Sequence, residues 1–139
     1  MSTDILSRLE SELIRFACAC LNKAECFKPF GVVEESDSGQ IGMATADGND
    51  MRAVISTLAD GMKAQALKGG IAAGGVCWLN QYTDQQTGKT VPTIICHVET
   101  VSGRGKMVMR PYKKRWLRGV TVGESVMNKE GELLIFNRR

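Results

Sequence analysis

The sequence has little of the side-chain chemistry from which catalytic and metal sites are built. It contains a single histidine, His97, and its five cysteines include no Cys-x-x-Cys pair with the spacing of a zinc site. The glycine-rich segment 69–75 is not followed by the Gly-Lys-Ser/Thr of a phosphate-binding loop, and a helix rather than a strand is expected before it. We therefore expect no catalytic residues, no metal and no cofactor. We interpret segment 69–75 as the end of a helix followed by a strand of small residues.

Long apolar runs are also missing. No run approaches the ~20 residues that a helix needs to cross a membrane. Residues 1–4 do not begin a basic stretch that leads into an apolar one, so we expect no export signal. An odd number of cysteines in such a chain is typical of reduced thiols in the cytosol. We expect a cytoplasmic protein without membrane contact, in which most cysteines are small buried residues.

What is present is the composition of one globular domain. The chain has 139 residues, of which 43% are hydrophobic and 24% are charged, as in an ordinary folded protein. No internal repeat and no low-complexity linker divides it. We predict a single domain over residues 1–139, long enough to bury roughly two-thirds of the surface that its unfolded chain exposes.

Two stretches have apolar residues at the spacing of an amphipathic helix. In residues 4–25 the apolar stripe includes Leu9 and Leu13, and in residues 49–68 it includes Leu58. Spacings of three and four residues place such side chains on one face of a helix. Short polar residues precede both stretches and supply caps for the first free backbone N–H groups.

The remaining segments read as strands joined by short turns. The first pair is a hairpin over residues 31–46 that turns at 36–39. The later strands are expected at residues 71–82, 91–101 and 106–112, followed by a last pair at 119–127 and 132–136 across a turn at 128–131. Strands joined by short turns are antiparallel.

This order predicts an α+β domain. We expect a two-layer sandwich in which an antiparallel sheet of about five to seven strands carries two helices on one face, in the order α-β-β-α-β-β-β with a C-terminal hairpin. The order of elements resembles that of the roadblock and profilin-like domains. That resemblance implies pairing through helices and sheet edges, so a homodimer is an open alternative.

A second resemblance rests on short motifs. The segments Phe27-x-Pro29-Phe30-Gly31, His97-Val98-Glu99 and Arg110-Pro111-Tyr112 are similar to segments of small uncharacterised bacterial proteins. The resemblance implies a bacterial protein, and it brings no catalytic residues with it.

The charge of the chain is unevenly distributed. Residues 1–103 have a net charge of −4 and residues 104–139 a net charge of +7, which agree with the overall +3. Segment 104–118 holds seven basic residues and no acidic one, with two aromatic rings among them. If residues 106–112 form a strand, the side chains of Lys106 and Arg110 share one face with that of Tyr112. We expect this basic face to point outward and the methionines of the opposite face to point into the core.

This segment provides the candidate partner-binding residues. They are Arg110, Tyr112, Lys113, Lys114, Arg115, Trp116 and Arg118. Clusters of arginine, tyrosine and tryptophan are typical of sites that bind an acidic protein. We therefore expect a non-enzymatic protein-interaction domain, such as an adaptor or a toxin-neutralising immunity protein.

Other interpretations of the same features stay open. The basic and aromatic segment is also typical of a nucleic-acid-binding module, because cations neutralise phosphates and rings stack on bases. Its charges can also simply protect a strand edge from aggregation. A third alternative is an enzyme that uses His97 as a base and Glu99 to orient it, since both point to one face of a strand.

Overall fold

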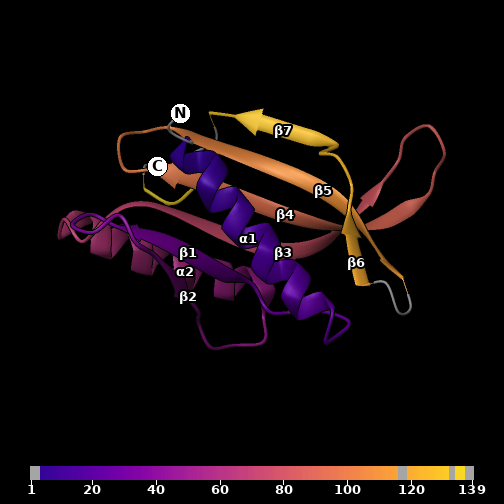
Figure 1. Ribbon diagram of the computed structural model, residues 1–139, viewed down its shortest axis with the longest axis horizontal. Coiled ribbons are helices and arrows are strands. Elements are labelled where there is room, and N and C mark those ends of the chain that lie inside the picture. Colours follow the sequence, from indigo (N-terminus) through magenta and orange to yellow (C-terminus); the bar gives the residue numbers. More distant parts are fainter. Residues whose placement is uncertain (1–3, 116–118, 132–133, 137–139) are drawn as a thin grey trace.

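The computed structural model describes residues 4–115, 119–131 and 134–136. These residues form two helices and seven strands (Figure 1). In chain order they are α1 (Ile5–Leu21), β1 (Phe30–Glu35), β2 (Ile41–Ala44), α2 (Met51–Leu67), β3 (Ile71–Thr83), β4 (Thr90–Thr100), β5 (Gly105–Arg115), β6 (Gly119–Val122) and β7 (Met127–Glu130).

The strands form one open antiparallel sheet. Their order across it is β2-β1-β3-β4-β5-β6, and β7 pairs with β5 as well. Every recorded pairing is antiparallel, including that of β1 with β3, which the chain reaches through α2. The α+β class and the seven-stranded antiparallel sheet are therefore confirmed.

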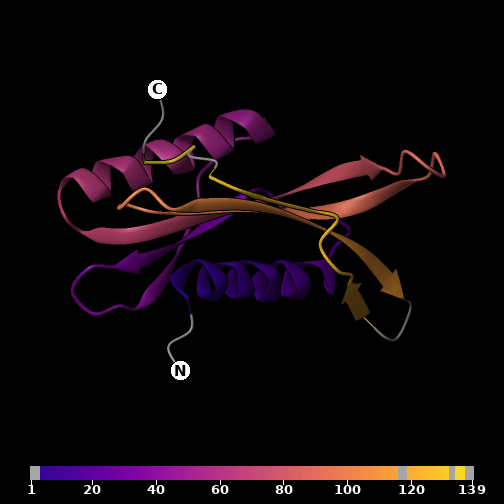
Figure 2. The same ribbon diagram turned by 90° about the horizontal axis from the view of Figure 1, so that it is seen from above.

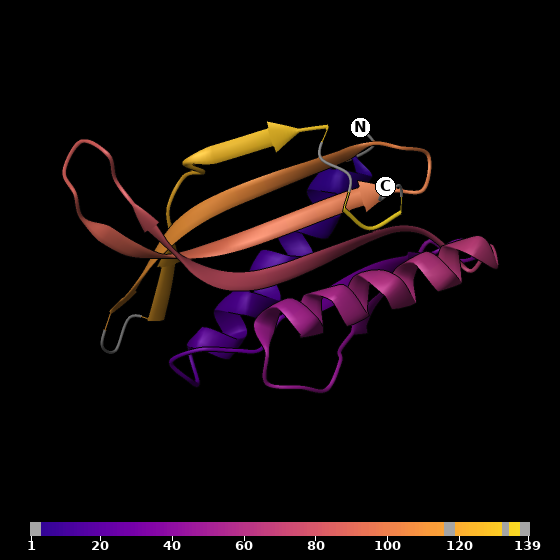
Figure 3. The ribbon, with the colours of Figure 1, turned by 180° about the vertical axis from the view of Figure 1, so that it is seen from behind.

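The prediction of two helices on one face is wrong, because one helix covers each face of the sheet (Figures 2 and 3). Neighbouring residues of β3 show why. Cys77 belongs to the core cluster under α1, which contains Leu9 and Leu13, whereas Val76 belongs to the cluster under α2, which contains Leu58. Successive strand residues point to opposite faces, and both of these are buried. The domain thus has three layers, with the sheet in the middle.

The glycine-rich segment serves packing, as expected. Gly69 follows the end of α2 with a positive φ of 77°, which favours glycine. A Cβ on Gly74 would lie 2.9 Å from Met62 Sδ of α2, and a Cβ on Gly75 would lie 3.1 Å from Leu13 Cδ1 of α1. Adjacent glycines thus let each helix approach its own face of β3.

The buried cysteines belong to the central strands. Cys77 on β3 and Cys96 on β4 are paired across the ladder with their sulfur atoms 3.9 Å apart, and all five cysteines are free thiols. Burial is the main reason that the pKa of Cys77 lies well above its ordinary value. Cys18 and Cys20 are half-buried and Cys26 is exposed, so the expectation that most of the cysteines are buried is wrong.

The predicted C-terminal hairpin does not form. Both β6 and β7 pair with β5 rather than with each other. The expected turn at 128–131 falls largely within β7, and residues 134–136 are not a strand. They lie on the α2 face, where Ile135 and Phe136 join the core. Residues 132 and 133 of the expected strand lie outside the described residues.

Candidate functional site

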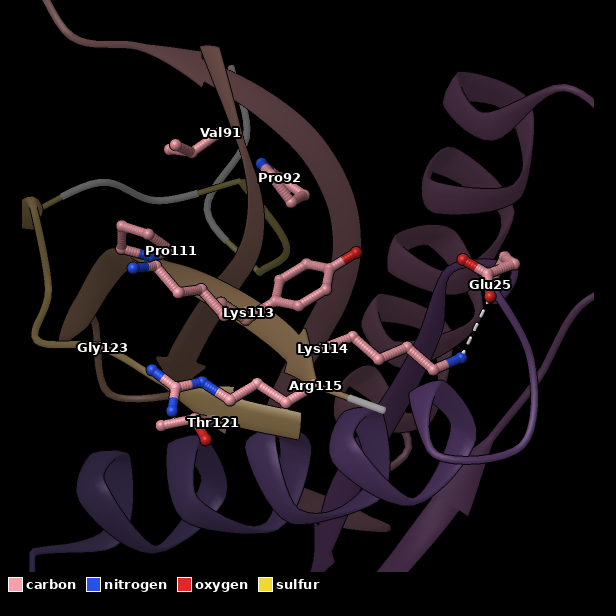
Figure 4. Close-up of a pocket in the computed structure, with 10 residues that line it drawn as sticks. Glu25, Val91, Pro92, Pro111, Lys113, Lys114, Arg115, Thr121 and Gly123 are labelled. Atoms are coloured by element: carbon pink, nitrogen blue, oxygen red, sulfur yellow. Dashed lines mark hydrogen bonds and ion pairs between the residues drawn. The ribbon is translucent and has the colours of Figure 1, made fainter. Parts of the chain in front are cut away.

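The predicted basic segment lines a groove at the end of the sheet where β3–β4 and β5–β6 diverge (Figures 1 and 4). We call it the cationic groove. Its volume is about 670 Å³. It is lined by Glu25, Val91, Pro92, Pro111, Tyr112, Lys113, Lys114, Arg115, Thr121 and Gly123. Four of the seven candidate partner-binding residues, at positions 112–115, therefore lie together.

The groove opens because β4 and β5 stop pairing. The last pair in the ladder joins Thr93 to Pro111, although β4 starts at Thr90 and β5 continues to Arg115. Pro92 and Pro111 lie at this point, and proline has no N–H to donate to a sheet. Beyond it, residues 112–115 of β5 have no strand partner on the β4 side among the described residues, while their other edge pairs with residues 119–122 of β6.

The basic residues of β5 alternate between two environments. Lys114 donates to the Ala24 carbonyl at 3.1 Å and to Glu25 Oε1 at 3.2 Å. Figure 4 shows the side chains of Lys113 and Arg115 extending to the opposite side of the strand. Both are exposed, and no described residue forms an ion pair with either of them. Two uncompensated positive charges thus remain at the groove.

Tyr112 forms part of the groove wall. It is half-buried and packs against the core under α1. Burial is the main reason that its pKa lies above the ordinary value, and the nearby Glu25 raises it further. The phenol is therefore neutral at physiological pH and offers the groove a partly apolar surface.

Arg110 does not line the groove, although its guanidinium donates to the carbonyl of Gly123, which does, and the face on which we placed it is not exposed. Its guanidinium Nε donates to Glu10 Oε2 of α1 at 3.0 Å, and Lys106 Nζ lies 2.9 Å from Glu10 Oε1. Val108, between them on the same face, is buried. The expected outward basic face is thus wrong, because α1 covers it. The methionines of the other face, Met107 and Met109, are half-buried.

Two further candidate residues, Trp116 and Arg118, lie outside the described residues. Sequence reasoning also missed residues that build the site from other elements. Val91 and Pro92 come from β4 and Thr121 from β6, and no local pattern links them to β5. The sequence did contain a signal for Glu10. This residue lies within the apolar stripe of α1, where a charged side chain indicates a buried partner of opposite charge.

His97 and Glu99 form a separate buried cluster on β4. His97 Nε2 donates to Glu99 Oε2 at 2.5 Å. Glu99 also accepts from three successive backbone N–H groups: that of Leu134, that of Ile135 at 2.6 Å and that of Phe136 at 3.0 Å. Burial raises the pKa of Glu99, but these hydrogen bonds lower it by more, so the net pKa lies below its ordinary value.

The chemistry of this cluster is constrained by its partners. Both oxygens of Glu99 are occupied, so this carboxylate anchors residues 134–136 to the sheet. His97 is 1% exposed and lines a cavity of about 250 Å³. Its Nδ1 has no hydrogen-bond partner among the described residues. His97 and Glu99 therefore point to one face of β4 and contact each other, as the alternation of the strand predicts. Nδ1 is the ring nitrogen that this contact does not use.

Comparisons of the chain with protein-family models, curated proteins and solved structures find no match. Within the described ranges, no cluster of three or more histidine, cysteine or acidic side chains is arranged to hold a metal ion. In the same ranges, neither helix has the length and apolar character that crossing a membrane requires.

Proposed function

We propose that this protein is a non-enzymatic interaction domain that binds an extended acidic segment of a partner protein in the cationic groove. The supporting observation is the pair of exposed, uncompensated cations, Lys113 and Arg115, beside the apolar surface of Val91, Pro92 and Pro111. An apolar surface with a few fixed charges is typical of a recognition site.

The strand geometry suggests how the segment binds. Residues 112–115 of β5 extend beyond the last pair with β4, so their edge on the β4 side is free for an added strand within the described part of the chain. Lys113 and Arg115 are two residues apart and point to one face. An added strand presents every second side chain to that face. The matching segment therefore has acidic residues at alternate positions.

The same charges favour a short acidic segment over nucleic acid. Two of the expected cations are already in ion pairs: Arg110 with Glu10, which it shares with Lys106, and Lys114 with Glu25. A nucleic-acid strand places a phosphate at every nucleotide and gains affinity with each additional free cation. Among the described residues of segment 104–118, the cations without an ion pair are Lys113 and Arg115, and at strand spacing they match two carboxylates. Such a domain would act in the cytoplasm as an adaptor or as an immunity protein that covers an acidic partner.

The test is binding of a fluorescein-labelled peptide in which glutamate alternates with threonine, measured by fluorescence anisotropy at low salt. We expect saturable binding that weakens as salt is added, because exposed charges are screened. Double reversal, Lys113→Glu with Arg115→Glu, should weaken binding at least about tenfold, equivalent to about 1.4 kcal/mol.

The matched control reverses Lys63 of α2 and its C-cap residue Lys68. The double variant Lys63→Glu with Lys68→Glu changes the net charge equally outside the groove. Its affinity should stay within about twofold of the unmodified chain, well below one tenfold step. Equal weakening in both double variants would mean that net charge, not the groove, attracts the peptide. Tighter binding of single-stranded oligo-dT than of the peptide would replace the proposal with the nucleic-acid alternative.

A further inference from the structure

A second cavity lies on the α2 face, away from the cationic groove. Its volume is about 250 Å³. Its walls are mainly apolar and come from α2, β3 and the segment 134–136. The apolar lining residues are Ile55, Ala59, Val76, Trp78 and Ile135, together with Leu134. An apolar cavity of about 150 Å³ is enough to hold benzene, so this one accommodates a substituted single ring.

His97 gives this cavity a polar group without a partner. The ring is 1% exposed, and Nδ1 has no hydrogen-bond partner among the described residues. Because Nε2 is engaged by the Glu99 carboxylate, Nδ1 is the ring nitrogen left for a ligand, and it accepts a hydrogen bond in the tautomer that carries the proton on Nε2. Buried polar atoms are usually satisfied, and leaving one unpaired is costly. A ligand that supplies a donor would remove this cost.

The mouth of the cavity is positively charged. Arg52 and Ser56 of α2 line it, and no described residue forms an ion pair with the Arg52 guanidinium. The N-cap residue Asp50 accepts from the Arg52 backbone N–H, so its carboxylate compensates the helix dipole. The positive charge at this end of the cavity therefore comes from the Arg52 guanidinium. This end of the cavity favours an anionic group.

We propose that this cavity binds a small single-ring molecule with a hydroxyl group that donates to His97 Nδ1 and a carboxylate that meets Arg52. The apolar walls hold the ring, and the two polar groups fix its direction. This chemistry is that of a phenolic acid. The inference rests on the α2 face alone and does not depend on the proposed function of the groove.

The test needs three probes and the intact chain labelled with ¹⁵N. The probes are 4-hydroxyphenylacetate, phenylacetate, which lacks the hydroxyl, and 4-methylphenol, which lacks the carboxylate. Titrations are followed by ¹H–¹⁵N correlation spectra. We expect shifts at Val76, Trp78 and Ile135. Removing the hydroxyl should weaken binding about tenfold, because it leaves the buried nitrogen unpaired again.

The variant Arg52→Gln identifies the second contact without disturbing the core, because Arg52 is exposed. It should weaken the binding of 4-hydroxyphenylacetate at least threefold and leave the binding of 4-methylphenol unchanged, whereas Lys68→Gln, at the C-cap of α2, should change neither affinity. Equal affinities for 4-hydroxyphenylacetate and phenylacetate would overturn the role of His97. Shifts confined to residues 112–115, or none at millimolar probe, would overturn the site itself.

Discussion

Among the described residues, two carboxylates are buried, and each is held by a different set of donors. Glu99 is fully buried and accepts from a histidine and from backbone N–H groups. Glu10 is 8% exposed and meets the side chains of Lys106 and Arg110. A buried charge is tolerated only when it is paired and hydrogen-bonded. These two residues are therefore sensitive points of the fold.

The acid sensitivity of the protein should depend on Glu99. Its pKa lies below the ordinary value of 4.5, because its hydrogen bonds outweigh the effect of burial. The stabilisation is therefore complete above about pH 4.5 and is lost as the pH falls through the lowered pKa of the folded state. Glu99→Gln should lower the free energy of unfolding at pH 7 by about 3 kcal/mol. The amide NH₂ group of glutamine is a donor, and it would face the donors that now meet the carboxylate, which are His97 and the backbone N–H groups.

Urea unfolding followed by circular dichroism at a series of pH values measures this effect. The difference between the unmodified chain and Glu99→Gln should shrink as the pH falls below 4.5. Glu124→Gln, at an exposed position, is the control and should follow the unmodified chain. A difference that is constant from pH 7 to strong acid would contradict the lowered pKa.

Helix α1 carries two glutamates whose ion pairs differ in burial, Glu10 and Glu12, and comparing them measures what burial adds to an ion pair. Glu10→Gln leaves Lys106, with a side chain 14% exposed, without its carboxylate, and it also frees Arg110. We expect a loss of about 2 kcal/mol in the free energy of unfolding. Glu12→Gln removes only the exposed pair with Arg15 and should cost about 0–0.5 kcal/mol.

Thermal and urea unfolding of both variants measure this difference. Equal losses would mean that the contact between α1 and β5 adds no more than a surface ion pair. A larger loss for Glu12→Gln would contradict the assignment of Glu10 as the buried partner.

At the scale of elements, β3 is the strand on which both helices rest. Its apolar and small residues occupy both alternating positions from Ile71 to Leu79, so neither face of this stretch is polar. A strand covered on both faces has such a continuous apolar run. This pattern was readable in the sequence, and it argued against placing both helices on one face.

Gly75 and Gly61 test how close the packing on β3 is. Gly75→Ala would place a Cβ 2.8 Å from Val98 Cγ1 and 3.1 Å from Leu13 Cδ1, so we expect a loss of about 1–3 kcal/mol in stability. Gly61→Ala on α2 meets nothing within 4 Å and should raise stability by about 0.5–1 kcal/mol, because alanine favours the helix.

Chemical denaturation of the two alanine variants gives both values under the same conditions. Stability changes of the same sign would refute the assignment of Gly75 as a contact point between α1 and the sheet. The two outcomes are independent of ligands, since both positions lie outside the lining of the groove and of the second cavity.

At the scale of the whole molecule, the sheet separates two surfaces with different chemistry. The cationic groove lies at the end where β3–β4 diverges from β5–β6, and the cavity of His97 lies under α2. Figure 1 shows where the two pairs of strands diverge, and Figure 3 shows α2 across the other face of the sheet. Each draws residues from segments far apart in the chain, Glu25 with Lys114 in the groove and Arg52 with His97 in the cavity. Because the residues of each pair are far apart in the chain, no short sequence motif contains both of them.

The sequence by itself determined the α+β class, the helices and most strands, because periodicity and turn residues act over a few neighbouring positions. It also located residues 112–115, since charge is a property of composition. Only the tertiary structure decided which face each helix covers, that β6 and β7 both pair with β5, and that Arg110 forms an ion pair with Glu10. These outcomes depend on contacts between distant segments. The same contacts left Lys113 and Arg115 free at the groove and Nδ1 of His97 unpaired in its cavity among the described residues.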